Sequence, residues 1–195
     1  MILNGGKIWE QSFGHPFETM ELLDSLKGRG SLVITKLTME VGAEIFLRGG
    51  ICNSLREARY LIREALLSGR AAAAFSKLAA GQGIDSFDSL RKAVSHCRNS
   101  ILHSPQIGFL NSVDTNGIRS MISGAVGKGR RISLRLLKKE QDFVNKGTPL
   151  AEILSTGPND QEVQADEFTE FMTIGSDTLP YFPLVLDRMG TRSGP

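Results

Sequence analysis

The sequence predicts a mixed α/β fold in which a helical part is followed by a part rich in strands. Apolar residues recur at helical spacing through the first 80 residues, and short alternating segments follow residue 105. The composition supports a folded chain, because 41% of the 195 residues are hydrophobic and 23% are charged. We expect helices at 1–80, a polar connector at 81–104, a C-terminal α/β domain at 105–189 and a disordered tail at 190–195.

The helical part contains recognisable start signals. Residues 1–8 form a short strand candidate, and Pro16 then suits the first turn of a helix. Ser31 is a candidate N-cap, and Ser54 with Glu57 has the spacing of a capping box. The helices are expected from Pro16 to Gly28, from Ser31 to Gly49, from Ser54 to Gly69 and from Arg70 to Ala80.

The second part has a more strand-like pattern. After a short helix candidate at 86–94 within the connector, the pattern predicts a strand at 107–113 and a helix capped by Asp114. Ile132, Leu134 and Leu136 alternate as a half-buried strand. The remaining elements are expected to be a turn at 143–150 that leads into a strand at 150–154, an amphipathic helix at 161–174 and a strand at 183–186.

Charge and composition argue against several classes of protein. The formal net charge is only +2 and neither half is strongly basic, so the sequence does not favour a nucleic-acid partner. There is no run of 18 apolar residues, so we expect no membrane span. The two cysteines are far apart and the three histidines are scattered, which predicts no zinc site and a reducing, cytoplasmic location.

Several short motifs follow one another along the chain, at 41–50, 57–59, 64–71, 80–85, 108–118, 127–131, 137–151 and 183–189. Their order and spacing resemble the C-terminal half of the pyrimidine-nucleoside (thymidine) phosphorylases. Gly14, Glu18 and Glu21 match a further segment that borders the active-site cleft in that family, whereas His15 and Pro16 depart from it.

The resemblance implies a reaction, but the residues that carry out that reaction in the family have no match in this sequence. Family members use phosphate to cleave a pyrimidine nucleoside, and they give free base and a pentose 1-phosphate. Their phosphate loop, of the form Lys-x-Gly-Ser/Thr-Gly, and their base-binding residues lie in the N-terminal half. This sequence contains no such loop. We therefore expect a remnant of the large phosphorylase domain at 1–80, and we assign no catalytic residue, cofactor or metal ligand.

The implied partners follow from the same resemblance. They are phosphate, a pyrimidine nucleoside, and either a complementing N-terminal half or a second copy of the chain. The alternative is a non-catalytic relic or interaction domain. Because a partial domain leaves its core uncovered, we also expect exposed apolar surface on residues 32–46 and an unprotected strand edge at 1–8.

One turn is a speculative anion contact. The segment 127–131 combines glycines with three cations, Lys128, Arg130 and Arg131. Such a turn can hold an anion where its backbone amides converge. Common loop chemistry favours the alternative of a solvated turn between a helix and a strand.

The other titratable residues have weaker functional interpretations. His15 is expected to be a helix-entry residue rather than a general acid or base. Glu18 and Glu21 lie on one helical face, where a solvated pair that favours the helix dipole is preferred over a catalytic pair. The residues expected to have no catalytic role are His96, His103, Cys52 and Cys97.

The turn at 143–150 has a second interpretation. Turns of the form Asp-x-Val-x-x-Gly-x-Pro-Leu also occur in lipoyl and biotinyl carrier domains. Those domains require a modified lysine in a Met-Lys-Met or Asp-Lys-Ala hairpin, which this sequence lacks. We therefore expect a barrel-sandwich-like arrangement of strands without carrier function.

Overall fold

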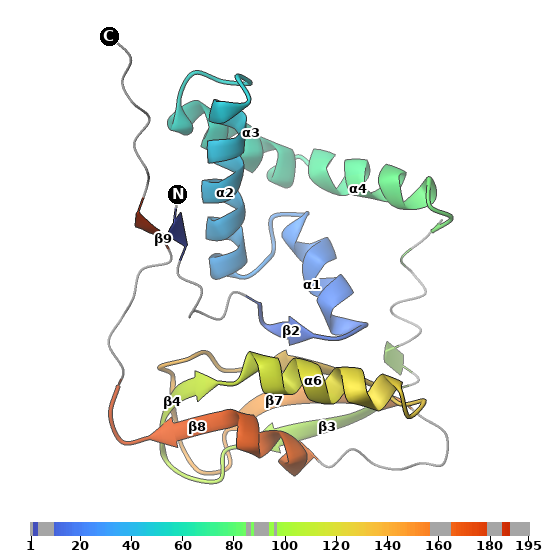
Figure 1. Ribbon diagram of the computed structural model, residues 1–195, viewed down its shortest axis with the longest axis vertical. Helices are drawn as coiled ribbons and strands as arrows, with labels where there is room; N and C mark the ends of the chain where they lie inside the picture. The colour runs from blue at the N-terminus through green and yellow to red at the C-terminus, as the bar shows by residue number, and fades with distance from the viewer. Residues whose placement is uncertain are drawn as a thin grey trace.

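Helices fill one end of the molecule, and antiparallel sheets fill the other (Figure 1). The computed structural model describes residues 2–3, 10–84, 87, 94–95, 97–156, 165–178 and 185–187. The helices are α1 (Phe17–Ser25), α2 (Leu32–Arg48), α3 (Leu55–Leu67), α4 (Arg70–Ala80), α6 (Thr115–Val126) and the 3-10 helix η2 (Ala165–Phe171). The strands are β1 (Ile2–Leu3), β2 (Ser12–Phe13), β3 (Arg98–His103), β4 (Gly108–Val113), β5 (Arg131–Leu136), β6 (Phe143–Val144), β7 (Pro149–Thr156), β8 (Met172–Gly175) and β9 (Val185–Asp187). The predicted mixed α/β class is confirmed.

The helices begin where the side chains can cap them. The Ser31 hydroxyl accepts a hydrogen bond of 3.2 Å from an amide in the first turn of α2. The Ser54 hydroxyl accepts the Glu57 amide at 3.1 Å, and the Glu57 carboxylate accepts the Asn53 amide at 3.0 Å, one residue before the amide expected for a capping box. Asp114 caps α6 through two amide hydrogen bonds. The three predicted capping residues are therefore confirmed.

The strands form a sandwich around one apolar core. One sheet has the order β2-β5-β7-β3 and the other has the order β6-β4-β8, with all neighbours antiparallel. Helix α6 contacts β5 and β2. The buried residues of this core are Phe13, Leu102, Leu110, Val113, Ile118, Ala125, Ile132, Leu134, Leu136, Val144, Leu150, Ala151, Ile153, Phe168 and Met172.

A second, smaller core joins α2 to α3. Ala43, Ala58, Ile62 and Leu66 are buried there. The two helices approach closely, because a Cβ atom placed on Gly42 would lie 2.7 Å from Cδ1 of Ile62. An ion pair of 2.9 Å between Arg59 and Glu40 spans the same two helices at the edge of this core.

Strand β2 connects the helical end to the sandwich. Ser12 and Phe13 pair with Arg135 and Leu134 of β5, which lies more than 100 residues later in the sequence. Phe13 is fully buried in the sandwich core. The chain therefore enters the C-terminal sheet before it forms α1, so the first 80 residues are not packed only among themselves.

Two segments differ from the sequence prediction. The helix expected at 161–174 is present as the 3-10 helix η2 at Ala165–Phe171, but the prediction is wrong at its end, where strand β8 begins at Met172. Strand β8 pairs with β4, and the β-branched Thr173 and Ile174 suit that pairing. The expected connector at 81–104 contains strand β3, whose polar residues tolerate an edge position in the sheet. The Asn99 side chain there donates to the Glu152 carboxylate of β7 at 2.9 Å.

Other predictions fall partly or wholly outside the described residues. The expected tail at 190–195 and His96 lie outside them, as does most of the helix candidate at 86–94. The strand expected at 1–8 is β1, which pairs with β9. Within the part of the chain that the structure describes, no helix is long and apolar enough to cross a membrane.

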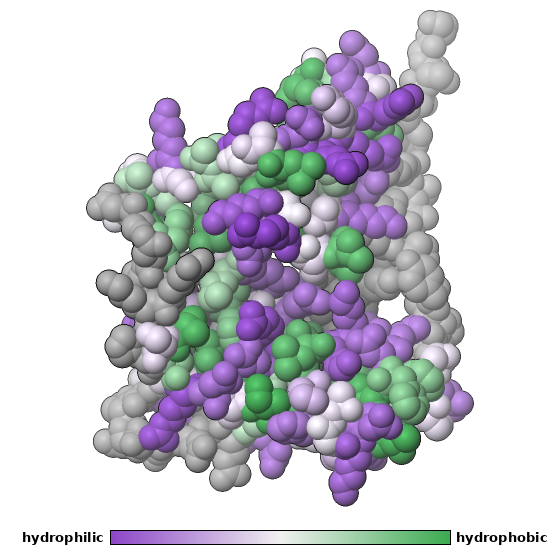
Figure 2. Space-filling view, turned by 180° about the vertical axis from the view of Figure 1, so that it is seen from behind, coloured by the Kyte–Doolittle hydropathy of each residue, from purple (hydrophilic) through white to green (hydrophobic). Residues whose placement is uncertain are grey.

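Some large apolar side chains remain exposed. In the helical part, Leu32 is 80% exposed, and Ile45, Ile51 and Leu78 are each 60% exposed. On the face seen in Figure 2, the coloured apolar residues form small groups that are separated by polar residues. The expected apolar exposure is thus present on α2, at Leu32 and Ile45.

We predict that Gly14→Ala destabilises the protein more than Gly50→Ala does. Both glycines have positive φ, +77° and +68°, so either alanine carries a left-handed backbone cost of about 1 kcal/mol. At Gly14 a Cβ would also lie 2.5 Å from the Ile132 carbonyl oxygen, whereas nothing lies within 4 Å at Gly50. Relief of that clash should cost a further ~1–3 kcal/mol. Urea unfolding of both variants measures the difference, and equal losses would contradict the prediction.

Candidate functional site

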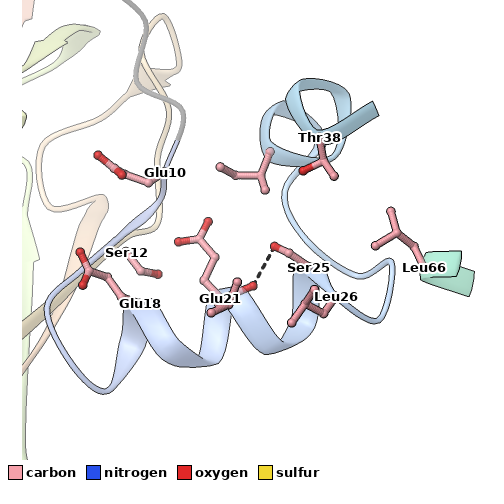
Figure 3. Close-up of a pocket in the computed structure, with 10 residues that line it drawn as sticks. Glu10, Ser12, Glu18, Glu21, Ser25, Leu26, Thr38 and Leu66 are labelled. Carbon is pink, nitrogen blue, oxygen red and sulfur yellow. Dashed lines mark hydrogen bonds between the residues drawn. The ribbon is translucent and has the colours of Figure 1, made fainter. Parts of the chain in front are cut away.

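An acidic cleft lies where the helical end meets the sandwich (Figure 3). Its volume is about 280 Å³. Glu10, Glu18 and Glu21 lie on one side of it, and Thr38 and Leu66 lie across from them. Its lining residues are Glu10, Ser12, Glu18, Glu21, Leu22, Ser25, Leu26, Ile34, Thr38 and Leu66. The predicted shared face of Glu18 and Glu21 is therefore confirmed, and Glu10 joins them from the segment before β2.

Each of the three carboxylates has a protein partner. Arg119 of α6 contacts Glu10 at 2.6 Å and Glu18 at 3.6 Å. The Glu21 carboxylate accepts the Gln11 amide at 3.2 Å and 3.3 Å, which ties α1 to the start of β2. These contacts give the carboxylates structural roles, and they make none of them a free general acid or base.

Arg119 is the cation that connects the sandwich to this cleft. Its guanidinium lies 5.4 Å from the centre of the Phe13 ring, within the range of a cation–π contact. The side-chain hydrogen bond to Glu10 raises the pKa of Arg119 above its ordinary value, and the negative charges of Glu10 and Glu18 add to that effect. Arg119 therefore stays charged, and it only partly offsets the three negative charges around the cleft.

A second, smaller cleft of about 150 Å³ lies on the other side of Glu21. It contains two cations, but each already has a carboxylate partner. Arg29 pairs with Asp24 at 2.9 Å. Arg135 pairs with Glu152, and its guanidinium lies 4.4 Å from the centre of the Phe17 ring. Neither cleft therefore offers the converging, unpaired cations that a phosphate dianion requires.

A buried hydroxyl holds the segment that borders both clefts. The Ser133 side chain donates to the Gly14 carbonyl at 2.8 Å and accepts the Phe17 amide at 3.0 Å. Ser133 is 1% exposed, so water cannot replace these bonds easily. The start of α1, including Glu18, is thereby positioned by a strand from the sandwich.

The histidines do not form part of a catalytic arrangement among the described residues. His15 is exposed, and Nδ1 of its ring lies 3.2 Å from the Thr19 hydroxyl. The His15–Pro16 peptide bond is cis, at the position where the sequence departs from the phosphorylase motif. His103 is exposed at the end of β3. These positions agree with a helix-entry role for His15 and a surface role for His103.

The turn at 127–131 places its backbone amides against helix α6. The amides of Lys128 and Arg130 both donate to the Ala125 carbonyl at 3.0 Å, and the Gly129 amide donates to the Val126 carbonyl. These bonds complete the C-terminus of α6, where the helix dipole favours cations and disfavours anions. Lys128 and Arg131 are exposed. The geometry therefore favours the solvated-turn interpretation over an anion contact.

The cysteines lack the setting of a nucleophile. Cys52 is buried, and its thiol donates to the Ser54 carbonyl at 3.5 Å. Burial raises the pKa of the Cys97 thiol, which lowers the thiolate fraction near neutral pH. In the described part of the chain, no group of three or more His, Cys, Asp or Glu side chains is placed to hold a metal ion.

The curated relatives of this chain are pyrimidine-nucleoside phosphorylases. The enzyme of Bacillus subtilis is 27% identical over 165 residues, which cover 79% of this chain and 38% of the enzyme. That of Staphylococcus haemolyticus is 27% identical over 164 residues. That of Staphylococcus aureus is 30% identical over 156 residues, which cover 74% of this chain and 36% of the enzyme. No protein-family model matches the chain.

These comparisons agree with the resemblance noted in the sequence, at low identity. The chain spans less than two-fifths of the length of these relatives. The motif at Gly14–Glu21, which is part of the resemblance, lies in the structure beside the acidic cleft. Sequence reasoning missed Glu10, Arg119 and Ser133, because their roles depend on pairing between segments more than 100 residues apart.

We predict that inorganic phosphate does not bind saturably at the 127–131 turn. Its amides at Lys128, Gly129 and Arg130 are already hydrogen-bonded to α6, and only side-chain charges remain for an anion. A phosphate titration followed by amide NMR should shift these residues weakly and linearly at physiological salt. A saturable shift that disappears in a Lys128→Ala, Arg131→Ala double variant would instead support the anion contact.

We also predict that Cys97 alkylates more slowly than a free thiol. Burial raises its pKa, so less thiolate is present at pH 8 in the folded protein than in the unfolded chain. With a Cys52→Ala variant to isolate the signal, the iodoacetamide rate of Cys97 should be lower in the folded protein than in the same variant unfolded in urea. A faster rate would indicate an activated cysteine.

Proposed function

We propose that this chain supplies part of a pyrimidine-nucleoside phosphorylase. In the proposed reaction, the bond between the base and the pentose breaks and a bond forms between the pentose and a phosphate oxygen. The products are free base and pentose 1-phosphate. The observation that carries the proposal is the similarity to the phosphorylases over about four-fifths of the chain.

The charge of the acidic cleft supports a division of contacts between this chain and other polypeptide. Its three glutamates outweigh the single charge of Arg119, so the cleft disfavours a phosphate dianion. We therefore propose that the contacts to phosphate and to the base come from polypeptide outside residues 1–195. The chain would provide one wall of the closed cleft, with a large-domain part at 1–80 and a C-terminal domain that begins with strand β3 at Arg98.

The alternative is a non-catalytic interaction domain that descends from such an enzyme. The full engagement of Glu10, Glu18 and Glu21 by protein partners favours this alternative, because none of them is free to act on a substrate. For either function we propose a cytoplasmic location, on the grounds of the resemblance to nucleoside-salvage enzymes and of two cysteines, Cys52 and Cys97, that form no disulfide.

A chimera tests the proposed function. Residues 1–195 would replace the matched part of the Bacillus subtilis phosphorylase in a single polypeptide, and release of thymine from thymidine in phosphate would be followed by chromatography. We expect the chain alone to release no thymine above background. The chimera should release thymine at a rate at least about tenfold above that background, because only the chimera combines a phosphate site with this wall of the cleft.

The control is the Bacillus subtilis polypeptide that lacks its matched part, which should be inactive. Circular dichroism would establish that the chimera is folded. A folded but inactive chimera would reject the proposed function and favour the non-catalytic domain. Base release by the chain alone would reject the proposed division of contacts between this chain and outside polypeptide.

A further inference from the structure

The outer face of the sheet that contains β4 and β6 carries two aromatic side chains. Side chains alternate between the two faces of a strand, and Leu110 and Val144 belong to the sandwich core. Phe109 and Phe143, their neighbours along the two strands, therefore lie on the outer face. Their rings form an edge-to-face pair with centroids 5.1 Å apart. The solvated face of an antiparallel sheet is normally polar, so this pair is an exception.

The aromatic pair is open to solvent. Phe143 is 53% exposed, and Ile107, two residues before Phe109, is 63% exposed. We call Phe109 and Phe143 the aromatic patch. Neither residue lines the acidic cleft or the smaller cleft beside it, so the patch is separate from the site described above. Large apolar side chains that gather on an exposed surface are typical of a contact with a partner.

Strand β6 also presents backbone groups at the edge of its sheet, because it ends the order β6-β4-β8 of the described strands. The Leu110 amide donates to the Asp142 carbonyl at 3.0 Å, and the Leu110 carbonyl accepts the Gln141 amide at 2.7 Å. The next opposed residues, Phe109 and Phe143, are therefore a non-hydrogen-bonded pair. The amide and carbonyl of Phe143 point away from β4, where an added strand can pair with them.

The exposed charge on both sides of β6 is positive. The charged residues between positions 138 and 146 are Lys138, Lys139, Glu140, Asp142 and Lys146. The Asp142 carboxylate accepts the Lys139 amide at 2.8 Å, so part of its charge is taken up within the turn. Lys139 and Lys146 are exposed, whereas the two acidic residues are half-buried. Exposed lysines thus precede and follow Phe143, which favours a partner of negative charge.

We propose that β6 is a docking edge for an extended, acidic segment of a partner protein. The segment adds a strand beside β6 through the Phe143 backbone and places an apolar side chain on the aromatic patch, with its carboxylates toward Lys139 and Lys146. A peptide is favoured over a nucleic acid, because a strand edge offers main-chain pairing and the formal net charge of the chain is only +2.

The test uses the full chain and a fluorescent peptide of sequence Glu-Glu-Ile-Thr-Ile-Glu-Glu, with binding followed by anisotropy. We expect saturable binding that weakens as salt is added. Phe143→Asp should weaken it by at least about tenfold, because the variant removes the apolar contact and repels the acidic peptide. Tyr60→Asp is the matched control, since Tyr60 is an aromatic residue of α3 that is 61% exposed. Circular dichroism would establish that both variants are folded.

Two further measurements separate strand addition from a non-specific apolar contact. A Lys139→Glu, Lys146→Glu double variant should lose the acidic peptide and bind instead the version in which Lys replaces each Glu, because the charges are exchanged. Hydrogen exchange at the Phe143 amide should slow when the acidic peptide is bound, since that amide gains a main-chain acceptor.

The docking edge would be overturned by any of three results: no saturable binding of the acidic peptide, equal binding by Phe143→Asp, or unchanged exchange at the Phe143 amide. Tighter binding of single-stranded oligothymidine, lost in Phe143→Asp, would assign the patch to nucleic acid instead. A dimer of the chain that Phe143→Asp dissociates in sedimentation would assign it to a second copy. All of these results are independent of phosphorolysis by the chimera.

Discussion

The hydroxyl of Ser133 is the contact on which the relation between the two ends of the molecule depends. It donates to the Gly14 carbonyl and accepts the Phe17 amide, so it satisfies two backbone groups at the start of α1 from inside the sandwich. The adjacent pairing of β2 with β5 holds the same segment in the sheet. Because both contacts are buried, the position of α1 cannot change without exposure of unpaired polar groups.

The charge of the acidic cleft follows from that arrangement. Glu18 and Glu21 line it because α1 begins where Ser133 holds it, and Glu10 is brought in by the segment that leads to β2. Arg119 of α6 pairs with Glu10 and Glu18 and neutralises part of the charge. A cleft with this charge balance is unsuited to hold phosphate on its own.

Local structure was largely predictable from the sequence, because caps and periodicity act over a few residues. Ser31, Ser54 and Asp114 begin their helices as their side chains require. The helix predicted at 161–174 was wrong at its end because Met172–Gly175 completes the sheet beside β4, and this pairing is set by tertiary structure and not by local propensity. The ion pair of Glu18 with Arg119 could not be predicted from the sequence, because the two residues lie about 100 positions apart and no local pattern marks the pair.

The pairing of β1 with β9 has a consequence for the folding of the chain. It brings residues 2–3 beside residues 185–187, which lie more than 180 residues later in the sequence. Closing a loop of that length costs chain entropy before the two strands can pair, so this ribbon depends on the earlier formation of the structure between them.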